Sequence, residues 1–180
     1  MQLEIGANHD GQTLWVRYSL TNDTSADVFV QHLDGGGDPI TRPYIYHVRP
    51  RQVVLWLGTP PPIIGTGHGP LVSFAQPPIP WAQRLSPGES LDELLRLPLP
   101  LVELGLWISG EGPLESVWAD VIRVRLDVQP KRRRLTIEEH QGSYWIHGPD
   151  PLVLEASTTL DPPIAVRRYA EGFHRAGLED

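Results

Sequence analysis

Alternation of apolar and polar side chains restricts the fold of this chain more than any other feature of its sequence. In residues 12–22 the alternate positions separate into an apolar and a polar set: Leu14, Val16, Tyr18 and Leu20 against Arg17, Ser19 and Thr21. A period of two places such sets on opposite faces of a β-strand, as in an antiparallel sheet with one buried face. Residues 116–128 show the same pattern, and the set expected to face the core is Trp118, Ile122, Val124, Leu126 and Val128.

Several shorter segments also have the composition of strands: residues 1–6, 26–33, 44–49, 52–57 and 101–109. Only the polar residues 22–25 separate the strand at 12–22 from the one at 26–33. Two strand-like runs joined by a short polar turn are typical of a β-hairpin. We therefore predict that these two strands pair with each other.

Residues 90–97 fit two structures. Ser90 and Glu93 have the spacing of a helix capping box, but Pro98 leaves too little room for a stable helix. A strand is favoured here. Such a strand must either turn Glu93 toward the interior or bulge around it.

Residues 58–88 break the alternation because they contain eight prolines, at positions 60, 61, 62, 70, 77, 78, 80 and 87. Neither a helix nor a central strand is expected at this spacing, although residues 71–75 fit a brief edge strand. The apolar side chains of this segment, among them Ile63, Ile64 and Trp81, nevertheless favour burial. We predict an ordered excursion that packs on the domain.

The run Pro130-Lys131-Arg132-Arg133-Arg134 marks a predicted boundary, and three short strands are expected beyond it, at residues 135–139, 143–146 and 152–157. The tail carries helix signals: Asp161 as cap, Pro162 at the first position, and Val166, Tyr169, Ala170 and Phe173 on one face. The predicted fold is all-β. An antiparallel β-sandwich occupies residues 1–128, and a small β-rich appendage, residues 129–180, packs on it and ends in a short helix.

Two motifs resemble those of bacterial immunoglobulin-like sandwich domains. Val16-Arg17-Tyr18-Ser19-Leu20-Thr21-Asn22 is similar to a strand of that family that ends in Leu-Thr-Asn. Leu85-Ser86-Pro87-Gly88-Glu89-Ser90-Leu91 is similar to its Leu-x-Pro-Gly-Glu turn. The resemblance implies an immunoglobulin-like sandwich over roughly residues 1–128. It implies no function, because this architecture hosts many unrelated ones.

Charge and composition exclude several classes of protein. The chain has 22 acidic and 15 basic residues and a net charge of −7, which argues against nucleic-acid binding and against an anionic membrane surface. No cysteine is present, so disulfides and thiolate chemistry are excluded. The N-terminus lacks the basic and apolar segments of a signal peptide. A cytoplasmic location is predicted, with the periplasm or secretion as the alternative if a leader has been removed.

Motifs that carry chemistry are scarce, and no cofactor or metal is predicted. Residues 65–70 are glycine-rich around His68, which suits an anion-binding loop but equally a simple turn. Glu138 and His140 would share one face of a strand, as an acid–base pair or as a charged edge. His32 and Asp34 have the spacing of two metal ligands without a third. The residues from Lys131 to Arg134 favour a solvated linker over a phosphate site.

Aromatic residues suggest recognition. The chain has six tryptophans, of which Trp15 alternates away from the predicted core set. Trp81 lies between Pro80 and Ala82, where the prolines would hold it at low entropic cost.

The leading hypothesis is a non-catalytic domain that binds a protein or small ligand through residues 58–88, with Trp81, Ile63, Ile64 and His68 as contact residues. The alternatives are a hydrolase or lyase that uses a histidine–carboxylate site, and a protein that self-associates as a homodimer through a sheet edge.

Overall fold

The structure is a computed structural model, and it describes residues 1–33, 44–49, 51–58, 81–102, 114–132, 135–147 and 151–169. These ranges form strands and no helix. The strands are β1 (Gln2–His9), β2 (Thr13–Thr21), β3 (Val28–Leu33), β4 (Tyr44–Arg49), β5 (Arg51–Trp56), β6 (Trp81–Leu85), β7 (Ser90–Pro98), β8 (Leu101–Val102), β9 (Leu114–Pro130), β10 (Thr136–His140), β11 (Ser143–His147) and β12 (Leu152–Tyr169). None of the described residues belongs to a helix that could cross a lipid bilayer.

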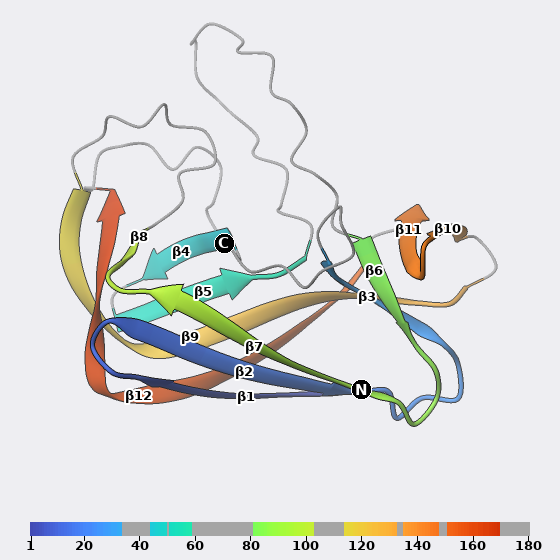
Figure 1. The fold of residues 1–180 in the computed structure, drawn as a ribbon, viewed down its shortest axis with the longest axis horizontal. Helices are drawn as coiled ribbons and strands as arrows, with labels where there is room; N and C mark the ends of the chain where they lie inside the picture. Colours follow the sequence, from blue (N-terminus) through green and yellow to red (C-terminus); the bar gives the residue numbers. More distant parts are fainter. Residues whose placement is uncertain are drawn as a thin grey trace, which may run out of the picture.

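The strands form two sheets, which confirms the predicted all-β class (Figure 1). The smaller sheet has three strands in the order β1-β2-β7. The larger sheet has nine, in the order β10-β11-β6-β3-β9-β12-β8, with β5 on β9 and β4 on β5. Two pairs, β5 with β9 and β8 with β12, are parallel, whereas the sequence led us to expect antiparallel pairing throughout.

The long strand β9 connects the parts of the larger sheet. Along one edge it pairs with β12 from Leu114 to Val128. Its other edge is divided between β5, which pairs in parallel with the segment 119–125, and β3, which pairs antiparallel with the segment 127–130. The predicted boundary between residues 128 and 129 therefore falls inside a single strand.

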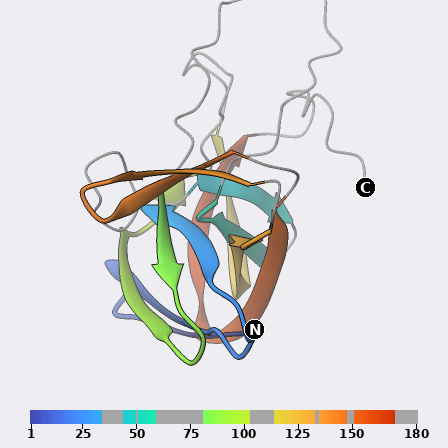
Figure 2. The ribbon, with the colours of Figure 1, turned by 90° about the vertical axis from the view of Figure 1, so that its right-hand side faces the viewer.

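The core lies between the two sheets. Inward-facing residues of the small sheet, such as Leu14, Val16 and Leu95, pack in one cluster with Val30 and Leu126 of the large sheet. All five are at most 3% exposed. A second cluster lies on the other face of the large sheet, where the hairpin of β10 and β11 covers Phe29 and Ala82 (Figure 2).

The predicted hairpin between residues 12–22 and 26–33 is wrong, because β2 and β3 belong to different sheets. The buried side chain of Asn22 explains the crossing. Its Nδ2 donates to the carbonyls of Ala26 at 2.9 Å and of Leu85 at 3.0 Å. The polar turn is thus tied to β6, and it carries the chain from one sheet to the other.

The prediction that no central strand lies within residues 58–88 is also wrong, since β6 pairs with β3 on one side and with β11 on the other. The segment Trp81–Leu85 contains no proline, so all its amides can donate to neighbouring strands. Ile63, Ile64, His68 and the predicted edge strand at 71–75 lie outside the described residues.

The predicted terminal helix is replaced by strand as far as Tyr169. Ile164 and Val166 alternate into the core, at 2% and 0% exposure, and pair with β9. Pro162 and Pro163 fall where the register with β9 shifts, between Thr159 and Ile164, so their missing N–H groups interrupt no regular pairing. Burial of the alternating side chains outweighs the local helix signals.

Trp118 does not face the core as predicted, because it is 67% exposed. The register between β5 and β9 passes from Ala119 directly to Val121, which leaves Asp120 as an extra residue. Such a bulge reverses which side chains face inward. Before the bulge Ala119 is buried, and after it Ile122 is buried.

Two glycines provide a test of this packing. A Cβ at Gly58 would lie 2.3 Å from Cγ of the buried Asp127, whereas a Cβ at Gly6 would meet nothing within 4 Å. We expect Gly58→Ala to lower the free energy of unfolding by about 1–3 kcal/mol. Gly6→Ala should leave it unchanged or raise it by up to about 1 kcal/mol. Urea denaturation of both variants measures the difference, and equal stabilities would contradict the close contact at Gly58.

Candidate functional site

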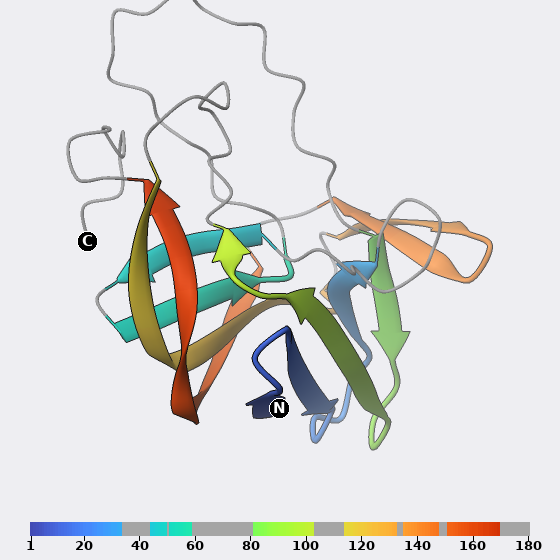
Figure 3. The ribbon, with the colours of Figure 1, turned by 60° about the vertical axis from the view of Figure 1, so that its left-hand side comes forward.

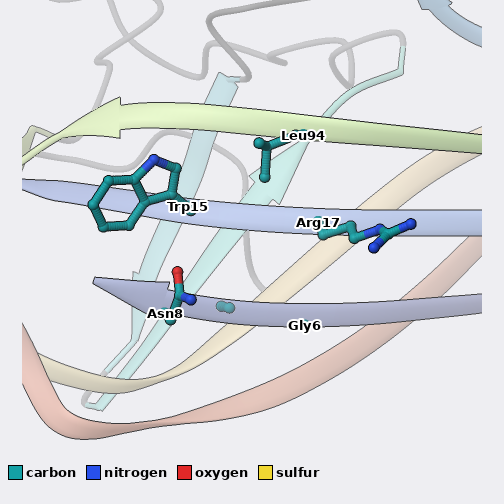
Figure 4. A pocket seen from close by; sticks show the side chains of 6 residues that line it. Gly6, Asn8, Trp15, Arg17 and Leu94 are labelled. Carbon is teal, nitrogen blue, oxygen red and sulfur yellow. The ribbon is translucent and has the colours of Figure 1, made fainter. Parts of the chain in front are cut away.

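A shallow hollow of about 740 Å³ lies on the outer face of the three-stranded sheet (Figure 4). It is lined by residues from all three strands: Gly6, Ala7, Asn8, Trp15, Arg17 and Leu94. Trp15 faces away from the core here, as the alternation in residues 12–22 predicts. The sequence gives no direct sign of the hollow itself, because its lining comes from strands that are far apart along the chain.

Strand register places the side chains of the hollow beside one another. Asn8 lies directly across from Trp15, and Gly6 lies directly across from Arg17, on the facing strands β1 and β2. Leu94 of β7 is the neighbour of Arg17 on the other side. Since Gly6 has no side chain and open space above it, the floor of the hollow is bare backbone. The hollow therefore exists because a glycine interrupts the row of outward side chains.

The electrostatics of the hollow are mild. The guanidinium of Arg17 lies 3.3 Å from the carboxylate of Asp92, and both side chains are exposed to solvent. The remaining lining offers an indole ring, an amide and an aliphatic side chain. Histidines, carboxylates and hydroxyls are absent from the lining, so it holds no general acid or base that titrates near neutral pH. This set of groups suits binding better than catalysis.

The strand β6 meets the β10–β11 hairpin in the larger sheet (Figure 3), and a second group of candidate side chains lies there. The ring of Trp81 lies 5.9 Å from that of His140 and 5.9 Å from that of Trp145, at tilts of 46° and 43°. The structure thus brings together two features that the sequence analysis treated separately, Trp81 and the Glu138/His140 pair. We refer to Trp81, His140 and Trp145 as the aromatic cluster.

The aromatic cluster also contains a residue that the sequence analysis did not single out. Trp145 lies directly across from Glu138 in the β10–β11 hairpin and is 37% exposed. The sequence signal for this pairing is the Gln141-Gly142 turn between two strand-like runs. In the structure both turn residues have positive φ angles, 50° and 83°, as a tight hairpin requires. The ring of His140 lies beside that of Trp81 here, and Glu138 stands two residues before His140 on the same strand. The acid–base role of Glu138 and His140 remains a prediction.

A chain of polar side chains lies in the interior between the two sheets. The Tyr18 hydroxyl is 3.3 Å from Nδ1 of His32, and Nε2 of His32 is 3.1 Å from Oε1 of Gln83. Because an amide oxygen can only accept, Nε2 carries the proton and Nδ1 accepts from Tyr18. Glu93 lies beside this chain, since it faces inward directly across from Tyr18. The strand predicted at 90–97 is confirmed, and it turns Glu93 inward without a bulge.

Burial shifts the protonation of these groups. It lowers the pKa of His32 from 6.5 to about 4, and the hydrogen bond to Gln83 opposes this only in part. It also raises the pKa of Tyr18, with the charge of Glu93 as a smaller cause. The pKa of Glu93 is raised by burial and then by Asp92. His32 and Tyr18 are thus neutral at physiological pH, as a polar pair inside a core must be.

The other candidate residues have structural partners. Both ring nitrogens of His32 have hydrogen-bond partners, and Asp34 lies outside the described ranges. No group of three histidine, aspartate or glutamate side chains suited to a metal occurs among the described residues. Lys131 lies 3.2 Å from Asp27, which also pairs with Arg84 at 3.1 Å, so this lysine belongs to a surface ion network.

Comparisons with protein-family models, with characterised proteins and with solved structures give no match. The function must therefore be argued from the geometry of the molecule.

The buried histidine predicts a pH dependence of stability. Its folded pKa lies below its unfolded value, so between pH 6.5 and about 4 only the unfolded chain binds the proton. The contribution of His32 to the free energy of unfolding is complete above pH 6.5 and is lost as the pH falls through that window. Between pH 7.5 and pH 5 we expect the free energy of unfolding of the wild type to fall by about 2 kcal/mol more than that of His32→Gln.

Urea unfolding of both proteins at the two pH values measures this difference. Glutamine is the suitable replacement because it remains polar beside Tyr18 and Gln83 but does not titrate. Glu93, whose raised pKa has the opposite effect on stability, is present in both proteins and cancels. Parallel pH profiles for the two proteins would show that His32 is not buried as a neutral group.

Proposed function

We propose that this chain is a non-catalytic binding module that takes a neutral oligosaccharide in the hollow around Trp15. The single observation that carries the proposal is the hollow itself, in which an outward-facing indole borders a glycine floor and an amide. The proposal keeps the function expected from the sequence, a binding domain. It moves the contact surface from the proline-rich segment to the outer face of the three-stranded sheet.

The chemistry of the lining supports a sugar ring as the ligand. A pyranose has an apolar face of C–H groups, which an indole covers with a large area, and a rim of hydroxyls. The amide of Asn8 can both donate to and accept from these hydroxyls, and Arg17 can donate to them. The lining residues stand on paired strands, so little freedom is lost when a ligand binds.

The charges beside the hollow favour a neutral ligand over an anionic one. Arg17 already has Asp92 as a partner at 3.3 Å, so a ligand carboxylate or phosphate would compete with an existing ion pair. Exposed pairs of this kind are weak, yet the nearby carboxylate still repels an anion. An open, shallow site of this type is expected to bind with a Kd on the order of 0.1–1 mM.

The test is a titration with neutral hexasaccharides, namely those of cellulose, xylan, amylose and chitin, followed by the indole N–H signals of the tryptophans. We expect the Trp15 signal to shift with at least one of them. Trp15→Ala should weaken binding at least about tenfold through loss of the stacking surface. Gly6→Leu should abolish binding because it fills the floor of the hollow, while the fold is retained.

Two control variants locate the site. Trp118→Ala removes another exposed indole on a different sheet and should leave binding unchanged, as should Trp81→Ala. Loss of binding in Trp81→Ala but not in Trp15→Ala would move the site to the aromatic cluster. Failure of all four sugars to bind, or binding that survives in Gly6→Leu, would overturn the proposal. Cleavage of a bound sugar would favour the hydrolase alternative instead.

The aromatic cluster supports the second candidate function, contact with a protein partner near the proline-rich segment. Trp81 lies in this cluster, and tryptophans are enriched among the residues that dominate protein interfaces. The contact roles of Ile63, Ile64 and His68 remain predictions. The immunoglobulin-like topology also remains a proposal: the turns at Asn22 and Pro87-Gly88 support it, and the two parallel strand pairs depart from it.

A further inference from the structure

The outer edge of β7 has no strand beside it in the described ranges. In the three-stranded sheet β7 is the last strand, and it pairs with β2 on its inner edge over nine residues (Figure 3). An unpaired edge of this length is a ready template for another strand, unless charge, proline or a bulge blocks it. The pairing of β7 with β2 has no bulge, and the only proline of β7 is its last residue, Pro98.

The hydrogen bonds at both ends of β7 show which backbone groups face outward. The amide of Leu99 donates to the carbonyl of Gln12 at 2.8 Å, and the amide of Asn22 donates to the carbonyl of Glu89 at 3.0 Å. Bonded pairs alternate along an antiparallel ladder, so the odd-numbered residues of β7 bond to β2. The N–H and C=O groups of Ser90, Asp92 and the other even-numbered residues therefore point to the open edge.

The side chains of these even-numbered residues are exposed on the outer face of the sheet. Asp92 and Arg96 carry opposite charges on either side of Leu94, which is 49% exposed. The sequence is thus complementary to itself when read in the opposite direction. A strand with an acid, a leucine and a base at equal spacing matches a second, antiparallel copy of the same strand.

We propose that two copies of this chain form a homodimer in which β7 pairs antiparallel with the partner's β7 about a two-fold axis at Leu94. Leu94 then lies directly across from the partner's Leu94. Asp92 lies across from the partner's Arg96, and symmetry repeats this ion pair. The amides of Ser90, Asp92, Leu94 and Arg96 all find acceptors, since Ser90 meets the carbonyl of the partner's Pro98, which gives roughly eight backbone hydrogen bonds.

Other registers lose the leucine contact and the two Asp92–Arg96 ion pairs. An axis one residue earlier places Asp92 across from the partner's Leu94, and an axis one residue later places it across from the partner's Pro98, which has no N–H. An axis two residues away in either direction places like charges opposite each other, Asp92 on Asp92 or Arg96 on Arg96. Like charges directly across a sheet are destabilising. The register centred on Leu94 is therefore favoured over its neighbours.

The dimer would join the two small sheets into one continuous sheet of six strands. Leu94 lines the hollow around Trp15, so the two hollows would flank the symmetry axis on the same face. The dimer does not depend on what the hollow binds. If the hollow does bind sugar, two linked sites would raise the affinity for a long chain without any new contact.

The first experiment is sedimentation velocity of the full chain over a range from micromolar to several hundred micromolar. We expect a monomer–dimer equilibrium. Arg96→Asp should abolish it, since acids then lie across from acids, and the exchanged pair Asp92→Arg with Arg96→Asp should restore it. Leu94→Pro should also abolish it, because it removes an outward N–H that β2 does not use, and circular dichroism checks that this variant folds.

The second experiment tests the register. The chain has no cysteine, so a single introduced cysteine is a unique label. Leu94→Cys should be linked to its copy by a short bismaleimide, because the two positions meet on the axis. Asp92→Cys should not, because its copy lies roughly 14 Å away along the strands. A wild type that is monomeric throughout, a dimer that persists in Leu94→Pro, or equal linking at both positions would overturn the proposal.

Discussion

Backbone hydrogen bonds along both edges of β9 hold the nine-stranded sheet together. One edge pairs with β12 through most of its length, and the other is divided between β5 and β3. Its length of 17 residues allows β9 to pair with three neighbours in this way. The bulge at Asp120 adjusts the side-chain faces between the two halves of β9, and this explains why Ala119 and not Trp118 is buried. The inner face that β9 presents to the small sheet follows from this arrangement.

The two faces of the small sheet lie in different environments, one against the core and one outside it. The inner face is mostly apolar, and the Tyr18 hydroxyl on that face joins the buried polar chain through His32 to Gln83. The outward side chains of this sheet are not part of the core cluster, so Gly6 can leave a gap beside Trp15 without loss of core packing. The core residues and the proposed binding residues therefore lie on opposite faces of the same three strands, because successive side chains of a strand point to opposite faces.

Parts of the candidate site could be predicted from the sequence. The alternation in residues 12–22 places Trp15 outward, and Trp81 was singled out from its neighbouring prolines. The hollow, the contact of Trp81 with Trp145 and the polar chain from Tyr18 to Gln83 could not be predicted. Each joins strands whose pairing depends on long-range contacts, and a single sequence contains no measure of which strands become neighbours.

The sequence by itself determined where most strands lie and which of their side chains face inward, because the period of two is a local property of an extended chain. It determined little about which strands pair with each other. Only the tertiary structure decided that β2 and β3 lie in different sheets, that residues 161–169 extend β12 instead of forming a helix, and that β6 lies inside the large sheet. In each case burial in the shared core, together with pairing along β9 or β3, outweighs local turn and helix signals worth about 1 kcal/mol each.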